Sequence, residues 1–312
     1  MSTSTPQQTS LGIAFVIGAA CCFAVMDTTI RFIGSYFAVA FVLCARYGVH
    51  AVIMTLLVGL SQGRSFRSAN PMFQIARGAL LAFSSSMAFA ALRRMPVAEF
   101  TAIVMLTPVL ATLIAWVWLK EPVSRLRWML VLGGFAGALI VTRPGSGLIG
   151  WAALLPLAAA CSNAGFQIMT SRFAPAEDPF TTNFYTGLTG LTLALPLLLA
   201  SVHDPLAVVA QATPLHLGAL VAVACLGTAG HLLLILALGK APASTLMPFQ
   251  YAQLGAAALA GYVVFGLSPD GWGWLGMAII AVCGAASAWL NVRAAAERQQ
   301  PVSAVQVDTM FD

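Results

Sequence analysis

Charge is scarce in this sequence of 312 residues. Only 8% of the residues are Asp, Glu, Lys or Arg and 60% are hydrophobic, whereas soluble domains carry roughly 25% charged residues. Such a chain cannot cover itself with a polar surface, which excludes an ordinary soluble protein. It also lacks a long basic run, so its net charge of +5 predicts no nucleic-acid partner. Basic loops that face anionic lipid account for that charge.

Signals for disulfide bonds, metals, secretion, catalysis and ion conduction are missing as well. All six cysteines fall inside apolar runs without metal-ligand spacing. The first ten residues have no Lys or Arg to start a signal peptide, so the first helix is expected to be retained. No HExxH, GxSxG or P-loop lysine motif occurs, and neither a charged ring nor a filter loop suggests a channel. We therefore expect no cofactor and no metal ion.

Apolar runs of about 18 or more residues, the length of a membrane-spanning helix, recur along the whole chain. Pro108 and Pro248 interrupt two of them and are expected to cause kinks. The sequence predicts an all-α membrane protein with ten transmembrane helices and no soluble domain. The ten predicted spans are 11–32, 36–60, 73–92, 99–119, 126–142, 147–170, 180–201, 215–238, 244–266 and 272–292.

Basic residues gather at alternate ends of these spans. The outer ends hold only Arg31, Arg93, Arg94 and Arg143 if the amino terminus is cytoplasmic. Because Lys and Arg favour the cytoplasmic side, we expect a multi-pass protein of the cell inner (plasma) membrane. Both termini, including a polar tail at 294–312, are then cytoplasmic. The inner ends and loops hold Arg64, Arg67, Arg77, Lys120, Arg125, Arg127, Arg172, Lys240, Arg293 and Arg298.

A repeat relates the two halves of the chain. A shift of 146 positions aligns ALRRMP, residues 91–96, with ALGKAP, and a shift of 141 aligns TTIRF, residues 28–32, with MTSRF. We predict two five-helix repeats, 1–143 and 144–293. Because five is odd, the copies enter the membrane in opposite orientations, as in many secondary transporters. Chance overlap of Ala- and Leu-rich helices is the alternative.

Two long segments carry a resemblance to a known family. LTPVLATLIAWVWLKEPVSRLRWMLVLGGFAGALIVTRPG and FQYAQLGAAALAGYVVFGLSPDGWGWLGMAIIAVCG resemble the two EamA repeats of the drug/metabolite transporter superfamily. The resemblance covers nearly the whole chain and implies a ten-helix carrier. Many members of the superfamily export amino acids and other metabolites. Within the superfamily, the aromatic amino acid exporters are the most similar branch. The family often has an acid at the ends of the fourth and ninth helices. Glu121 matches the first, but Leu267 stands at the second, which argues against a symmetric acidic pair.

Ionisable side chains inside the spans are candidates for function, because they are costly in lipid. Asp27 and Arg31 are one turn apart and predict an ion pair at the membrane interface. The alternative makes Asp27 a protonatable coupling site or a ligand for a substrate amine. Arg46 either holds a substrate carboxylate or locks its helix in place. His50, one turn further, is expected to be a polar packing residue.

Polar side chains from both halves are predicted to meet near mid-membrane. The 146-residue shift places His231 opposite Ser85, next to Ser84, and Asn163 and Gln167 share one helical face. Amides in a membrane need hydrogen-bond partners, so this face is expected to point into protein or a wet cavity. Serines that merely pack between helices are the alternative. His231 either links transport to proton movement or only donates a hydrogen bond.

The ninth span is the most polar one. Gln250 and Gln253 fall on a helical face that continues to Ala257, with Tyr251 on a second face. Ser244 lies in the first turn of this span, where free backbone amides can bind a carboxylate. We expect Ser244, Gln250, Tyr251 and Gln253 to contact the substrate.

These features together predict a carrier that works by alternating access. Amides and hydroxyls near apolar residues suit a zwitterion with an apolar side chain. We therefore expect the carrier to export small metabolites, and we expect amino acids, including aromatic ones, to be the substrates. A proton-coupled exporter of drugs, cations or other metabolites with the same fold is the first alternative. An integral membrane enzyme is the second. The expected partners are this small molecule and the lipid bilayer, and a monomer is favoured.

Overall fold

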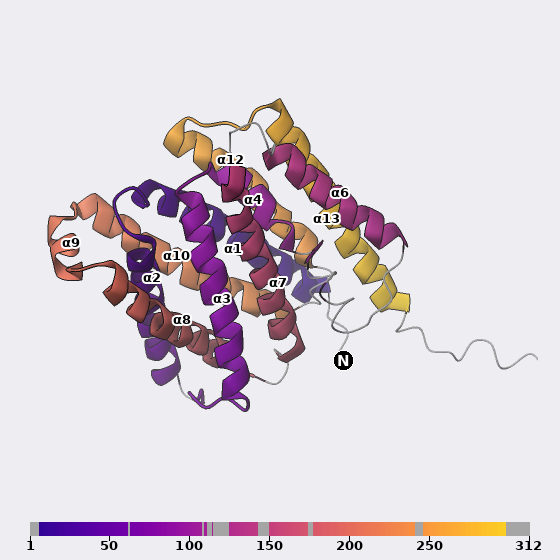
Figure 1. The fold of residues 1–312 in the computed structure, drawn as a ribbon. Helices are drawn as coiled ribbons and strands as arrows, with labels where there is room; N and C mark the ends of the chain where they lie inside the picture. The colour runs from indigo at the N-terminus through magenta and orange to yellow at the C-terminus, as the bar shows by residue number, and fades with distance from the viewer. Residues whose placement is uncertain are drawn as a thin grey trace, which may run out of the picture.

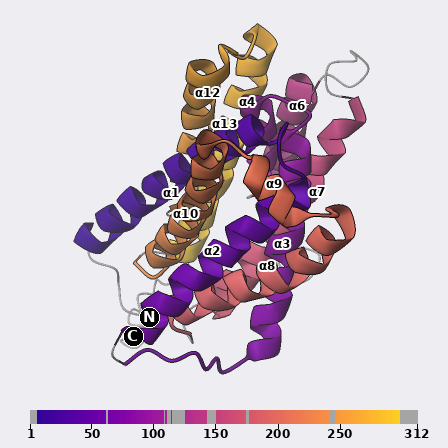
Figure 2. The ribbon, with the colours of Figure 1, turned by 90° about the vertical axis from the view of Figure 1, so that its left-hand side faces the viewer.

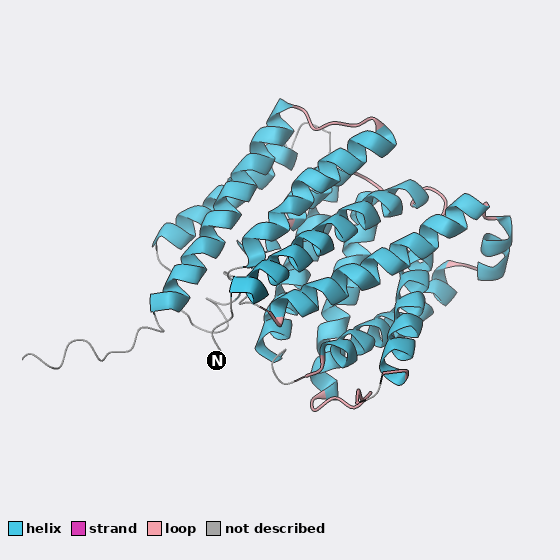
Figure 3. Ribbon diagram, turned by 180° about the vertical axis from the view of Figure 1, so that it is seen from behind, coloured by secondary structure: helices cyan, strands magenta, loops and turns pink. Residues whose placement is uncertain are grey.

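The computed structural model describes residues 6–61, 63–107, 109–110, 114, 125–142, 150–173, 177–240 and 246–297. Every regular element within these ranges is a helix (Figure 1, Figure 3). In chain order the helices are α1 (Pro6–Ile33), α2 (Val39–Gly59), α3 (Pro71–Leu92), α4 (Val97–Val104), α6 (Arg125–Thr142), η1 (Gly150–Ala153), α7 (Leu154–Phe173), α8 (Pro179–Ser201), α9 (Pro205–Gln211), α10 (Pro214–Leu238), η3 (Met247–Tyr251), α12 (Ala252–Phe265) and α13 (Gly271–Glu297).

The helices confirm the predicted all-α membrane architecture. Six stretches are long and apolar enough to cross a membrane, in α1, α2, α3, η1 with α7, α8 and α10. Helices α6 and α13 add shorter apolar stretches. The fourth predicted span begins as α4, and the described part of the ninth contains η3 followed by α12. The short helix α9, which joins α8 to α10, was not predicted.

Local sequence signals set where several helices begin and end. Helices α3, α8, α9 and α10 all start with proline, a position where the missing amide hydrogen does no harm. The Asp178 carboxylate caps α8, because its Oδ2 accepts hydrogen bonds from the amides of Phe180 and Thr181 at 3.1 and 3.0 Å. Helix α12 ends at Gly266, whose φ of 66° lies in the left-handed region that glycine tolerates best.

The packing of the helices repeats in the two halves. Helix α1 packs on α10 as α7 packs on α3, and α1 packs on α12 as α7 packs on α4. Helix α2 packs on α8 (Figure 2), and α6 packs on α13 at one edge of the molecule (Figure 1). Exchanging the two halves interchanges the pairs made by α1 with those made by α7, and it converts the pairs α2 with α8 and α6 with α13 into themselves. Two repeats of five helices with opposite orientations are expected to pack in this way.

The fourth and ninth membrane segments both change conformation partway. Helix α4 ends at Val104, and a turn follows at Met105. In the ninth segment the 3-10 helix η3, which contains Pro248, precedes α12. The expected interruption of the ninth span at Pro248 coincides with η3. The Tyr251 hydroxyl donates a hydrogen bond to the Met105 carbonyl at 3.4 Å, so equivalent points of the two repeats, 146 positions apart, touch each other. Pro108 and Glu121 lie outside the described residues.

The outside of the bundle is apolar, and buried polar side chains lie between the helices. Leu60 and Leu206 are more than 80% exposed, whereas Arg46 and Arg77 are each 1% exposed. Lipid tails accept the outer leucines, while the arginines need partners inside the protein. Several of these buried polar groups, Arg46 among them, line the candidate site.

Candidate functional site

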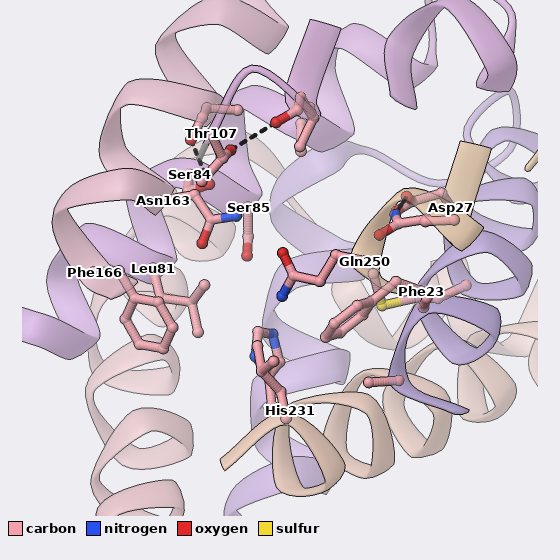
Figure 4. Close-up of a pocket in the computed structure, with 18 of the residues that line it drawn as sticks. Phe23, Asp27, Leu81, Ser84, Ser85, Thr107, Asn163, Phe166, His231 and Gln250 are labelled. Carbon is pink, nitrogen blue, oxygen red and sulfur yellow. Dashed lines mark hydrogen bonds between the residues drawn. The ribbon is translucent and has the colours of Figure 1, made fainter. Parts of the chain in front are cut away.

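One cavity lies where α1, α2, α3, α4, α7, α10, η3 and α12 meet, and we call it the central cavity (Figure 4). It contains about 860 Å³ of atom-free space, a figure that includes its open mouth. Both repeats contribute to its wall. The predicted site residues that line it are Asp27, Arg46, Ser84, Ser85, Asn163, Gln167, His231, Gln250 and Gln253.

Four polar side chains in this lining make no hydrogen bond with the part of the chain that the structure describes. They are the amides of Asn163, Gln167 and Gln250 and the imidazole of His231. Figure 4 shows Gln250 and His231 pointing toward one another, across the cavity from Asn163. Gln250 and His231 are buried, and Asn163 and Gln167 are half-buried, so these unpaired groups are placed to bind water or a ligand in the cavity.

Phenylalanine rings form much of the apolar wall. The Phe23 ring meets the His231 ring edge-on, with centroids 4.9 Å apart and an interplanar angle of 61°. Phe166 approaches the same imidazole at 6.2 Å, and Phe89 and Phe100 also line the cavity. Rings beside unpaired amides can hold a flat ligand by its face and its polar edge. Sequence reasoning did not single out these rings, because phenylalanine is common throughout the apolar spans.

Arg46 serves both the packing of the helices and the cavity. Its Nη1 donates to Ser85 Oγ at 3.0 Å, and Tyr47 donates to the same oxygen at 2.9 Å. The guanidinium carbon lies 4.7 Å from the centroid of the Tyr47 ring. Its Nε has no hydrogen-bond partner among the described residues. Arg46 thus ties α2 to α3 and also brings a buried positive charge to the cavity wall.

The predicted ion pair between Asp27 and Arg31 is wrong. Asp27 is only 5% exposed, and its Oδ2 accepts a hydrogen bond from Gln253 Nε2 at 3.4 Å. Arg31 instead donates to the carbonyls of Leu92 and Met95 in the connection from α3 to α4. Carbonyls at the end of a helix lack partners within it, so they compete successfully for the guanidinium. Asp27 is left to face the cavity.

Two predicted site residues are not found in the lining. Tyr251 is buried, and its hydroxyl is used by the Met105 carbonyl rather than by the cavity. Ser244 lies outside the described residues. Ser84 does line the cavity, but its hydroxyl donates to the Ala159 carbonyl at 2.9 Å and so also ties α3 to α7.

Arg77, expected at a cytoplasmic helix end, is buried behind the cavity wall. Its Nη2 donates to the Thr182 carbonyl and to Thr186 Oγ1, both at 2.6 Å, and its Nε donates to Gln74 Oε1 at 3.2 Å. The guanidinium carbon also lies 5.0 Å from the centroid of the Phe166 ring, which lines the cavity. Threonines in an apolar helix are inconspicuous in sequence, so this network was missed. His50, by contrast, packs as expected, with Nε2 3.1 Å from the Asn183 carbonyl.

The sequence pattern of one family matches this chain twice, over residues 10–143 and 150–289, and its description is EamA-like transporter family. The chain belongs to this family. The two matches account for most of the chain and confirm the resemblance found in the sequence. Together with the apolar helices, they identify a multi-pass membrane transporter.

Relatives with named substrates differ from the amino acid exporters that the resemblance implied. A riboflavin transporter of Rhizobium johnstonii is 32% identical over 69% of this chain and 70% of its own. A riboflavin transporter of Vibrio cholerae serotype O1 is 33% identical over 59% of this chain and 60% of its own. An S-adenosylmethionine uptake transporter of Rickettsia bellii is 26% identical over 84% of this chain and 87% of its own.

A solved structure described only as a crystal structure of a protein has the same overall fold. It superposes with a TM-score of 0.61 over 90% of this chain and 98% of its own. The sequence identity is 21%, so this likeness concerns the fold alone.

Proposed function

We propose that this chain carries a flat, nitrogen-containing heteroaromatic metabolite across the cell inner membrane, with riboflavin as the first candidate. The observation that carries the proposal is one cavity in which unpaired amides lie beside phenylalanine rings. A flavin has a broad ring system for such rings, an edge of alternating donors and acceptors for the amides, and a hydroxylated side chain. The relatives named as riboflavin transporters support the same choice.

Alternating access in this proposal is a rocking of residues 1–143 against 144–293 around the central cavity. Met105 lines the cavity and also accepts the hydrogen bond from Tyr251. We therefore take the paired interruptions of the fourth and ninth segments as the pivot. Uptake is the proposed direction, because the S-adenosylmethionine relatives are named uptake transporters.

A zwitterion with a ring-containing body is the second candidate. Asp27 and Arg46 bring opposite charges to one cavity without an ion pair between them in the described chain. A substrate amine would bind Asp27 and a carboxylate would bind Arg46. S-adenosylmethionine and the aromatic amino acids have both groups, and amino acid export, the expectation from the sequence, belongs to this candidate.

Transport by the purified protein in liposomes tests which of the two candidate substrate classes the chain carries. Radiolabelled riboflavin, S-adenosylmethionine and phenylalanine are compared in the same preparation, and saturable riboflavin uptake is expected. Movement of phenylalanine or S-adenosylmethionine without riboflavin would replace the first candidate by the second. Failure of all three to move would refute the proposal.

A matched pair of glutamine variants tests the site. Gln250→Ala removes an unpaired amide from the cavity, and the loss of one ligand hydrogen bond, about 1 to 1.5 kcal/mol, corresponds to a roughly five- to tenfold weaker affinity. Gln211→Ala removes an exposed amide from α9 and should leave affinity unchanged. Equal affinities of the two variants would contradict this use of Gln250.

A further inference from the structure

We propose that Asp27 is a proton-binding site and that a proton crosses the membrane with each ligand. This inference rests on the proposed transport through the central cavity, but it holds for any ligand of that cavity. Asp27 is the sole carboxyl among the described residues that line the cavity. Ionisable residues inside membrane helices often belong to proton pathways. Whether Asp27 can bind a proton depends on the groups that surround its carboxyl.

Asp27 has little compensation for a negative charge. It is 5% exposed, and its hydrogen bond from Gln253 Nε2 is long, at 3.4 Å. Arg31, one turn away, is committed to the carbonyls of Leu92 and Met95. A buried carboxylate without an ion pair is costly, and protonation removes most of that cost. The neutral acid is therefore an accessible form of Asp27.

The charged and titratable groups around Asp27 come from few helices. Arg46 of α2 and His231 of α10 line the same cavity, and Glu99 of α4 lies with Arg31 in a separate pocket. Helices α3, α7 and α12 face the cavity with hydroxyls, amides and apolar side chains. The positive charge of Arg46 favours the carboxylate form of Asp27, and burial favours the neutral acid. A ligand bound in the cavity can therefore shift the protonation equilibrium of Asp27.

Only one repeat carries this acid. The 141-residue shift places Ile168 of α7 at the position equivalent to Asp27. A rocking motion of the two halves therefore presents the same single carboxyl to each side of the membrane in turn. Proton and ligand share one cavity, which is the simplest arrangement that couples their movements.

The proton step is a simple exchange with water. On the outer side, Asp27 takes a proton from water and donates it as a hydrogen bond to an acceptor atom of the ligand, because only the neutral acid can donate. On the inner side the ligand leaves and the carboxyl returns the proton to water. No bond other than O–H forms or breaks.

Infrared difference spectroscopy tests the site without relying on transport. A change of pH should produce a carbonyl stretch of a protonated, buried carboxyl in the wild-type protein. Asp27→Asn should remove this band, and Asp27→Glu should restore a shifted one. Asp204→Asn, which removes an exposed carboxylate at the start of α9, should leave it unchanged. A wild-type spectrum without such a band, or a band that survives in Asp27→Asn, would overturn the proton site.

Liposome transport then tests the coupling. With the outside more acidic, the wild type should accumulate riboflavin above equilibrium. Asp27→Asn should lose the accumulation, whatever rate of exchange of labelled for unlabelled riboflavin it retains. Accumulation by Asp27→Asn, or wild-type accumulation that ignores the pH gradient, would overturn the coupling. If the wild type moves no ligand at all, the proposed function fails, while the infrared result still decides whether Asp27 binds a proton.

Discussion

Gly190 lies where α8 crosses the ring of Tyr47 on α2, and the structure leaves no room there for a side chain. A Cβ atom on Gly190 would lie 2.3 Å from Tyr47 Cδ1 and 2.4 Å from Cε1, far inside ordinary contact at 3.4–4 Å. Tyr47 is 1% exposed, so its ring has little space to move aside. Its hydroxyl also holds Ser85 in the cavity wall. Gly190→Ala should therefore displace Tyr47 and release Ser85.

The size of this effect follows from three contributions. Overpacking a buried site costs about 1 to 3 kcal/mol, and the lost hydrogen bond from Tyr47 to Ser85 adds about 1 kcal/mol. Alanine in a helix stabilises the fold by about 0.5 to 1 kcal/mol relative to glycine. The net loss of stability is about 1 to 3.5 kcal/mol. With an unfolding entropy of about 2.1 cal/mol/K per residue, this loss lowers the Tm of a chain of 312 residues by roughly 1.5 to 5 °C.

Thermal unfolding in a fixed detergent, followed by circular dichroism, measures the change. Gly48→Ala is the matched control. Gly48 lies on the α2 side of the contact between α2 and α8, and its Cβ would lie an ordinary 3.8 Å from Leu191 Cδ1. This control should be neutral or slightly stabilising. In a Tyr47→Ala background, Gly190→Ala should cost little more, because the ring it meets is gone. The reasoning is refuted if Gly190→Ala and Gly48→Ala unfold at the same temperature.

Two other buried contacts give predictions of the same kind. Arg77→Met should cost at least about 3 kcal/mol, because two hydrogen bonds from a charged group are lost inside the bundle. Arg64→Met in the exposed connection from α2 to α3 should change stability by less than about 1 kcal/mol. Equal recovery of folded protein for both variants in size-exclusion chromatography would contradict this. Gly284→Ala would place a Cβ 1.5 Å from the Tyr251 hydroxyl, whereas a Cβ on Gly255 meets nothing within 4 Å. A Tm lowered by Gly284→Ala but not by Gly255→Ala is expected, and unchanged melting of both would show that Tyr251 moves aside freely.

Much of the fold could be predicted because a membrane restricts the choices. A span in lipid must satisfy its own backbone hydrogen bonds, so long apolar runs imply helices, and α2, α8 and α10 begin and end close to the predicted runs. The 3-10 conformation of η3 in the ninth segment could not be predicted in this way. Hydropathy is the same for both helix types, and the conformation depends on packing, including the contact of Tyr251 with Met105.

The candidate site was only partly predictable, for a similar reason. Polar residues in apolar runs stand out, so the amides and His231 were found from the sequence. The choice of partner among them depends on three-dimensional packing. Arg31 lies one turn from Asp27 but bonds to carbonyls of another helix, and Arg77 is buried although its position in the sequence suggests a helix end.

The two halves share a packing pattern but differ in chemistry, and this difference limits what the cavity alone can do. Gln250 and Gln253 correspond to Val104 and Thr107 under the 146-residue shift, so a ligand meets the same amides from either side of the membrane. Such asymmetry can give the two orientations different affinities. It cannot produce accumulation, because the free energies around a closed cycle of binding and reorientation must sum to zero without an energy source. Under the proposed coupling, the amides and rings therefore determine which ligand binds, and the proton on Asp27 determines in which direction it accumulates.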